Sequence, residues 1–216
     1  MILIIMSLTV ITGPMYAGKS TQLILQLERY ELAGKKVRLY KTLLPRSPQP
    51  KYEIVTHGQL KKEATFLQPT RAEVQRMVRE VLEKELYAIG IDEGHFFQPE
   101  SGIIEGLNYL ADKGVHVFFA ALNMDFRGES FPIMKELLPI ADEVIYLKAV
   151  CTYKLKNGKT CGRPATRTQR LIDGNPAPYD SPVYLPRGKV EGKLVTYEAR
   201  CREHHFVPKK PNFELV

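Results

Sequence analysis

The most informative segment of this sequence is Gly13-Pro14-Met15-Tyr16-Ala17-Gly18-Lys19-Ser20, which fits the pattern G-x-x-x-x-G-K-[ST]. Its glycines let the backbone wrap closely around a phosphate group, with successive N–H groups pointing inward. The segment follows an apolar run and opens a run with helical spacing, so the positive end of a helix would face the anion. We expect it to bind nucleotide phosphates, with Lys19 reaching the β- and γ-phosphates and Ser20 ligating Mg²⁺.

Two adjacent carboxylates, Asp92 and Glu93, follow a second strand-like segment. In P-loop proteins, an acid at the carboxyl end of a neighbouring strand holds Mg²⁺ directly or through water, and Asp92 suits that role. Glu93 then lies at the crevice where open α/β sheets bind substrates. The pair suggests two roles, one carboxylate on the metal and one that handles a proton.

The first two-thirds of the chain alternate between strand-like and helix-like segments. Strands are predicted at residues 3–12, 37–41, 87–92, 115–121 and 143–147, and helices at 19–33, 70–85, 103–113 and 132–138. Thr70 followed by Glu73 is a capping-box signature. Residues 43–58 contain three prolines and little periodicity, which predicts a loop. This alternation predicts an α/β fold, a P-loop parallel sheet flanked by helices on both faces.

Charge is spread unevenly over the 216 residues, whose net charge is +7. Residues 1–147 hold 17 Lys and Arg against 18 Asp and Glu, whereas residues 148–216 hold 14 against 6. Gly and Pro also become frequent after residue 148, and helical periodicity disappears. We therefore predict a P-loop domain at residues 1–148 and a small basic lobe at 149–216. A basic lobe favours polyanionic partners, although a solvated Lys and Arg face is the alternative.

Apolar patterning predicts a cytoplasmic protein without a membrane anchor. No apolar run reaches the roughly 18 residues that span a bilayer. Residues 1–6 are apolar but lack a basic region and a cleavage site, and they are better interpreted as part of a buried strand. Three cysteines cannot form a disulfide framework.

All three cysteines lie in the basic lobe, and with one histidine they could supply four metal ligands: Cys151, Cys161, Cys201 and His204. Cys201-x-x-His204 is a tight pair of the kind found in structural zinc sites. Nine residues separate Cys151 from Cys161, so unrelated free thiols are the alternative on spacing alone. Four protein ligands would close the site and make zinc structural. His205 is an alternative ligand that the sequence leaves open.

Further motifs make the chain resemble a known family, the zinc-containing thymidine kinases, over nearly its whole length. The matching stretches are Gly13 to Thr21, Ile91-Asp92-Glu93-Gly94-His95-Phe96-Phe97, Ala120 to Gly128, Ala149-Val150-Cys151, Cys161 to Leu171, and Tyr197-Glu198-Ala199-Arg200-Cys201-Arg202. Several motifs in the right order are far more specific than any one of them.

The resemblance implies transfer of the ATP γ-phosphate to the 5′-hydroxyl of thymidine. It implies ATP binding at Gly13, Pro14, Met15, Tyr16, Ala17, Gly18, Lys19, Ser20 and Thr21, Mg²⁺ at Ser20 and Asp92, and Glu93 as general base. Nucleoside-binding positions are Phe96, Leu122, Phe126, Phe131, Thr168 and Tyr197. The resemblance also implies that Tyr197 belongs to a long lasso loop of the zinc lobe, which closes over the nucleoside with backbone hydrogen bonds. Taken singly, such aromatic residues are more often part of a core. The implied structural zinc ligands are Cys151, Cys161, Cys201 and His204.

The family also implies a homotetramer that thymidine triphosphate (dTTP) inhibits. This chain lacks the Asp-x-Arg-Tyr stretch that many members carry after the second strand, and Arg46 is the candidate replacement for its arginine. The competing hypothesis is a P-loop ATPase whose basic zinc lobe binds nucleic acid. We expect no nucleic-acid partner, because no basic stripe interleaved with stacking aromatic residues is present.

Overall fold

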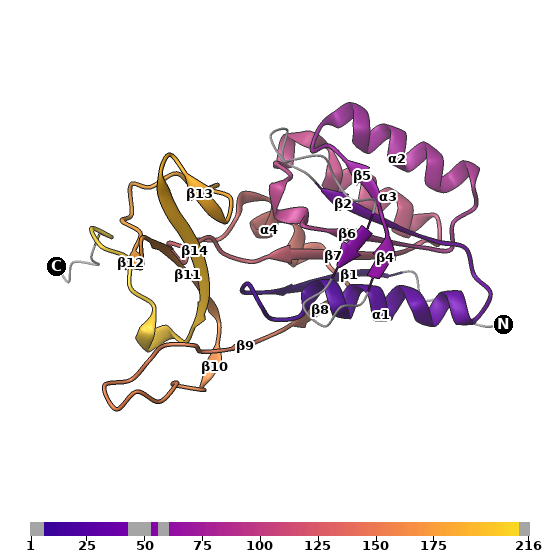
Figure 1. Cartoon of the computed structure of the whole chain (residues 1–216). Coiled ribbons are helices and arrows are strands. Elements are labelled where there is room, and N and C mark those ends of the chain that lie inside the picture. The colour runs from indigo at the N-terminus through magenta and orange to yellow at the C-terminus, as the bar shows by residue number, and fades with distance from the viewer. Residues whose placement is uncertain (1–6, 43–52, 56–60, 212–216) are drawn as a thin grey trace. The chain divides into compact units, whose positions relative to one another are not determined.

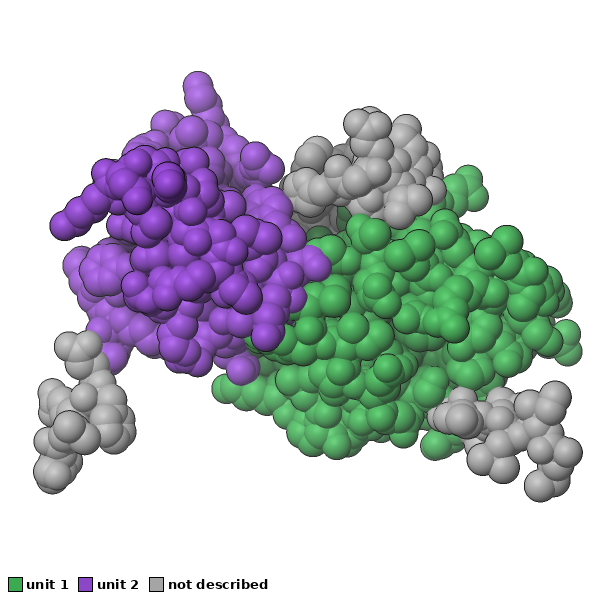
Figure 2. Space-filling model, turned by 90° about the horizontal axis from the view of Figure 1, so that it is seen from below, with its two compact units in different colours: residues 1–12, 18–123, 131–147 green, residues 13–17, 124–130, 148–216 purple. Residues whose placement is uncertain are grey.

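The computed structural model describes residues 7–42, 53–55 and 61–211. The chain forms two compact units, which Figure 2 shows in green and purple. Unit 1 comprises residues 1–12, 18–123 and 131–147, and unit 2 comprises residues 13–17, 124–130 and 148–216. The P-loop motif therefore contributes residues to both units, while a domain boundary near residue 148 stays a prediction.

Unit 1 is built on a six-stranded sheet (Figure 1). Its strands are β1 (Leu8–Gly13), β2 (Val37–Thr42), β5 (Thr65–Leu67), β6 (Ala88–Asp92), β7 (His116–Leu122) and β8 (Glu143–Tyr146). They follow the order β5-β2-β6-β7-β1-β8. The pairs β2–β5, β2–β6, β6–β7 and β1–β8 are parallel, with Ile89 opposite Val117. The predicted parallel α/β fold is confirmed.

Helices cover both faces of this sheet. They are α1 (Lys19–Leu32), α2 (Arg71–Glu83), α3 (Ile103–Asp112) and α4 (Pro132–Leu137), with the 3₁₀ turns η1 (Gly94–Phe96), η2 (Pro99–Ser101) and η3 (Leu138–Ile140). Figure 1 shows α1 on one side and α2 with α3 on the other. Gly90 of β6 lets α1 approach closely, because a Cβ there would lie 2.9 Å from Leu23 and Leu27 side-chain atoms. Burial of these apolar faces is the main stabilising contribution.

The predicted elements of unit 1 lie close to their observed bounds. The Thr70 hydroxyl accepts a hydrogen bond from the Glu73 amide at 3.4 Å, so the predicted cap of α2 is confirmed. The loop predicted at residues 43–58 is wrong for its described part, because β3 (Glu53–Val55) pairs with β4 (Lys61–Glu63) in an antiparallel ribbon. Arg46 and residues 1–6 lie outside the described residues.

Unit 2 holds antiparallel strands. β9 (Ala149–Val150) pairs with β10 (Pro164–Ala165), and a second sheet runs β12-β11-β14-β13. Its strands are β11 (Arg167–Ile172), β12 (Asn175–Pro176), β13 (Gly188–Val190) and β14 (Lys193–Arg200), followed by the 3₁₀ turn η4 (Arg202–His204). One small core cluster consists of alanine and cysteine side chains around β9, β10 and β14. A second cluster consists of Phe126, Ala177 and Val207. Both clusters are small, and a bound metal can stabilise a lobe of this kind.

Across the described part of the chain, the helices are too short or too polar to span a bilayer.

Candidate functional site

Ser20 and Asp92 meet at the carboxyl end of β6. Ser20 is the second residue of α1, and Asp92 is the last residue of β6. The Ser20 hydroxyl donates to Asp92 Oδ2 at 2.8 Å, and the carboxylate is buried. Burial, and then the charge of Glu93, raise the pKa of Asp92 to about 6. A cation in contact with this carboxylate would favour its ionised form.

The N-terminus of α1 is suited to an anion. Gly18 precedes the helix with φ of 82°, in the left-handed region that glycine adopts without strain. The first turn of α1 carries no acidic residue, and no side chain caps it. Lys19 opens this turn, and its pKa is lowered by burial while the charges of Glu93 and Asp92 act to raise it. The N–H groups at the start of α1 and the lysine therefore offer a phosphate a positive environment.

Glu93 lies in a strained backbone conformation directly after β6. Its φ of 57° and ψ of 33° place a non-glycine residue in the left-handed region, which costs about 1–2 kcal/mol. The chain then turns into η1, and Gly94 packs on β7 so tightly that a Cβ would lie 2.2 Å from the Phe119 ring. Strain that persists beside a buried carboxylate is typical of functional sites. The Glu93 side chain is 40% exposed, so an external group can reach it.

His95 is the residue around which the predicted nucleoside-binding residues of unit 1 gather. Its ring lies 4.2 Å from the Phe96 ring and 4.9 Å from the Phe131 ring, measured between centroids. The Leu122 amide donates to His95 Nδ1 at 3.5 Å. Burial lowers the pKa of His95 to about 3, so the ring is neutral. Glu93 Oε2, which lies 3.6 Å from Nδ1, therefore faces an uncharged imidazole.

The other three predicted nucleoside-binding residues, Phe126, Thr168 and Tyr197, belong to unit 2. The Met15 amide donates to the Thr168 hydroxyl at 3.0 Å. The Tyr16 hydroxyl donates to the Tyr197 carbonyl at 3.1 Å. Both bonds tie residues of the P-loop motif to the β11–β14 pair. Local sequence pattern could not predict these two bonds, because the partners lie more than 150 positions apart.

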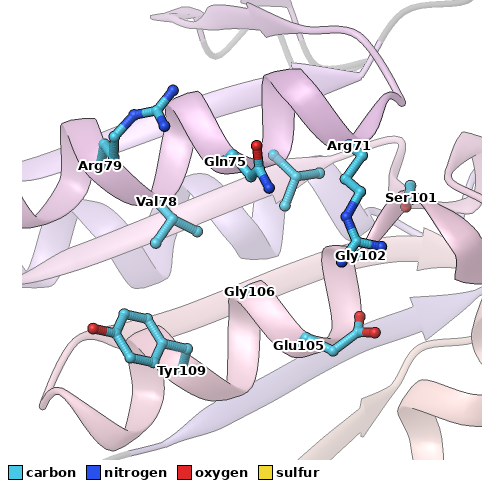
Figure 3. Close-up of a pocket in the computed structure, with 10 residues that line it drawn as sticks. Arg71, Gln75, Val78, Arg79, Ser101, Gly102, Glu105, Gly106 and Tyr109 are labelled. Carbon is cyan, nitrogen blue, oxygen red and sulfur yellow. The ribbon is translucent and has the colours of Figure 1, made fainter.

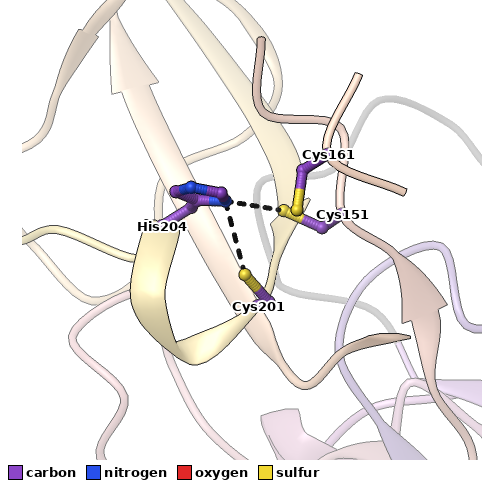
Figure 4. A group of neighbouring side chains, drawn as sticks. All are labelled: Cys151, Cys161, Cys201 and His204. Atoms are coloured by element: carbon purple, nitrogen blue, oxygen red, sulfur yellow. Dashed lines mark hydrogen bonds between the residues drawn. The ribbon is translucent and has the colours of Figure 1, made fainter. Parts of the chain in front are cut away.

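Four potential metal ligands form a cluster in unit 2 (Figure 4). The ligand atoms of Cys151, Cys161, Cys201 and His204 all lie within 4.8 Å of one another. His204 Nδ1 points toward the sulfurs of Cys151, at 3.7 Å, and Cys201, at 3.4 Å. Three cysteines and one histidine form one of the common donor sets of structural zinc sites. The predicted set is brought together, and it fits zinc.

A small hairpin explains the wide spacing between Cys151 and Cys161. Lys154 pairs with Thr160, and the Leu155 amide donates to the Lys159 carbonyl at 2.9 Å. The nine intervening residues thus return the chain to its starting point. Arg163 Nε donates to Cys161 Sγ at 3.3 Å and lowers the pKa of that thiol to about 6. This favours the thiolate form that binds metals.

His205 is excluded from the cluster by its own partner. Its Nε2 donates to the Phe126 carbonyl at 2.8 Å. Of the two histidines that the sequence left open, His204 is therefore the one beside the cysteines, and the Tyr153 ring stacks on it at 4.2 Å.

Replacing His204 with glutamine should release the metal, whereas His205→Gln should retain it. Loss of a residue that hydrogen-bonds to a metal ligand typically weakens metal binding about 10–100-fold. Loss of the ligand itself should weaken zinc binding by more than this. Zinc content per chain and competition with a chromogenic chelator measure this, with thermal unfolding as a second readout. Equal zinc loss in both variants, or no zinc in the wild-type protein, would contradict the assignment.

A groove of about 580 Å³ lies elsewhere in unit 1, between α2 and α3 (Figure 3). It is lined by valine side chains together with Arg71, Gln75, Arg79, Glu105 and Tyr109, among others. None of the site residues predicted from the sequence lines this groove. We therefore do not assign ATP or nucleoside binding to it.

Fold and motif together define a P-loop α/β protein with a Cys₃His cluster in its C-terminal antiparallel lobe. The sequence model of the family described as "Thymidine kinase" matches residues 6–205. The thymidine kinase of Thermococcus kodakarensis is 48% identical over 201 residues, which cover 93% of this chain and 94% of the relative. That of Pyrobaculum aerophilum is 41% identical over 204 residues, covering 93% and 99%. The chain belongs to the thymidine kinase family.

Proposed function

We propose that this chain is an ATP-dependent thymidine kinase, which transfers the γ-phosphoryl group of ATP to the 5′-hydroxyl of thymidine and yields thymidine monophosphate (dTMP). Family membership and the names of two closely similar relatives support the activity. The observation that carries the mechanism is the contact of Ser20 with Asp92, beside the strained Glu93. Ser20 of the P-loop motif, the buried Asp92 and the partly exposed Glu93 thus lie together at the carboxyl end of β6.

ATP is bound by residues 13–21 in this proposal. Their backbone N–H groups and the N-terminus of α1 hold the phosphates, and Lys19 binds the β- and γ-phosphates. Ser20 and Asp92 would hold Mg²⁺, which neutralises phosphate charge when bound. Phosphoryl transfer depends mainly on such positioning and electrostatic stabilisation.

Glu93 is the proposed general base. The 5′-oxygen of thymidine forms a bond to the γ-phosphorus, the bond from that phosphorus to the bridging β–γ oxygen breaks, and ADP leaves. The hydroxyl proton passes to the Glu93 carboxylate. Asp92 is less suited to this step, because its carboxylate is buried and hydrogen-bonded to Ser20.

Six residues are the proposed contacts of the nucleoside, and each set is described within its own unit. Phe96, Leu122 and Phe131 gather around the neutral His95, and Phe126, Thr168 and Tyr197 belong to unit 2. Aromatic rings with a few fixed polar groups suit a flat base and a sugar. We also infer structural zinc at Cys151, Cys161, Cys201 and His204.

The broader properties of the family complete the proposal. They include a P-loop domain at residues 1–148 and a zinc lobe at 149–216, whose lasso loop closes over the nucleoside. They also include a homotetramer, inhibition by dTTP, and a cytoplasmic location without a nucleic-acid partner. Light scattering of the purified protein, and inhibition assays with dTTP, test two of these directly.

A nucleoside panel tests the proposed activity. With Mg²⁺ and ATP present, ADP release should depend on thymidine, whereas ribonucleosides such as adenosine and cytidine should leave it near background. ADP release that is the same with and without nucleosides would instead indicate an ATPase. Binding to DNA with a steep salt dependence would favour the nucleic-acid hypothesis.

Thr168→Val should raise the KM for ATP as well as that for thymidine. The change preserves shape but removes the acceptor of the Met15 amide, so the P-loop backbone loses a bond from β11. A lost hydrogen bond of about 1 kcal/mol corresponds to roughly a fivefold change for each substrate. Thr168→Ser, which keeps the hydroxyl, is the control and should stay near wild type. Steady-state kinetics would contradict this coupling if only the thymidine KM rose.

A further inference from the structure

Arg170 is a buried cation in the middle of β11. The residue is 2% exposed, and its guanidinium lies over two aromatic rings, 4.0 Å from the Phe126 centroid and 5.3 Å from the Tyr197 centroid. A buried charge is stable only when its donors are satisfied. The acceptors of the Arg170 guanidinium therefore indicate which part of the chain this residue holds in place.

The guanidinium donors point at one short segment. Arg170 donates to the carbonyls of Pro182 and Val183, the latter at 2.5 Å, and its Nε donates to the Tyr197 hydroxyl at 3.0 Å. That hydroxyl in turn donates to the Leu185 carbonyl at 2.5 Å. We call this segment, residues 181–185, the strap.

A second arginine binds the near end of the strap. Arg127 donates to the Ser181 carbonyl at 2.7 Å, and its guanidinium lies over the Phe126 and Tyr179 rings. Four strap carbonyls thus accept bonds from side chains of β11, β14 and residues 124–130. The strap lies between β12 and β13, outside both strands, and the Ser181 amide donates to the Pro178 carbonyl at 3.0 Å.

We propose that Arg170 is a positioning residue for the nucleoside: it fixes the strap and the Phe126 and Tyr197 rings in one arrangement. This rests on the proposed function, in which Phe126 and Tyr197 bind thymidine. Arginine is needed because its planar fork satisfies several acceptors at once, whereas lysine is a point charge that cannot span them. The residue acts through its neighbours.

Arg170→Lys tests the proposal with two readouts. The KM for thymidine should rise at least about fivefold, while the KM for ATP and the kcat at saturation should stay within about twofold. Hydrogen exchange at the Val183, Tyr184 and Leu185 amides should accelerate at least about tenfold, without loss of zinc. Arg187→Lys, the same change at an exposed position near the strap, is the matched control and should leave both readouts unchanged.

Tyr197→Phe is the second variant, in case Arg170→Lys folds poorly. It removes one hydroxyl that links Arg170 to Leu185, and it should also accelerate strap exchange and raise the thymidine KM. The effects of the two substitutions should be less than additive in the double variant, because both disrupt the same hydrogen-bond network of Arg170, Tyr197 and the strap. Unchanged strap exchange in both variants, or an equal rise of both KM values, would overturn the proposal. If the wild-type protein did not phosphorylate thymidine, the proposed function would fail, whereas exchange would still test the strap.

Discussion

Replacing Glu93 with glutamine should lower kcat at least about 100-fold, since a positioned general base contributes about 10²–10⁴-fold. Glutamine keeps the shape of the side chain but cannot accept the proton of the 5′-hydroxyl. The KM values for ATP and thymidine should change little, because the loss falls on the chemical step. Steady-state kinetics with a product-specific assay measures both.

The control for this experiment is Glu100→Gln, which makes the same chemical change at an exposed position of η2 in the same unit. It should have wild-type kinetics. If Glu93→Gln retained a near-normal kcat, the base would lie elsewhere. If both variants lost activity equally, the loss would reflect folding, which a comparison of thermal unfolding would reveal.

Lys19→Ala should reduce kcat/KM for ATP by about 100-fold or more. A charge-assisted hydrogen bond is worth about 1.5–3 kcal/mol, and Lys19 is expected to contact two phosphates. Each 1.4 kcal/mol changes the rate about tenfold. The zinc content should be unaffected, because the metal ligands belong to unit 2 and Lys19 to unit 1.

Lys36→Ala serves as its control. Lys36 is an exposed lysine of unit 1 that pairs with Glu85 at 3.8 Å and donates to the Lys84 carbonyl at 3.2 Å. Exposed pairs of this kind contribute little, so its loss should leave kinetics unchanged. Turnover of Lys19→Ala within about threefold of wild type would show that the P-loop assignment is wrong.

The fold could be predicted for those strands and helices whose local sequence pattern matches their burial in the folded chain. Continuous apolar runs specified β1, β6 and β7, and Thr70 marked the start of α2 within one residue. The short strands β3, β4 and β5 were missed. Each has three residues, too few for a periodic pattern to stand out.

The candidate site was predictable as a set of residues, but the way they are held together was not. His95 and Arg170 lie inside motifs that the sequence singled out, yet their roles come from contacts with Leu122 and Phe126, far along the chain. A buried histidine and a buried arginine carry no local signal of burial. The choice of His204 over His205 likewise depends on a distant carbonyl.

Transfer of label from [γ-³²P]ATP tests the central claim most directly. With wild-type protein, Mg²⁺ and thymidine, the label should appear in thymidine 5′-monophosphate, one equivalent for each ADP formed. Without thymidine the label should remain in ATP. Label released as inorganic phosphate at the same rate with and without thymidine, and none in the nucleotide product, would contradict the account.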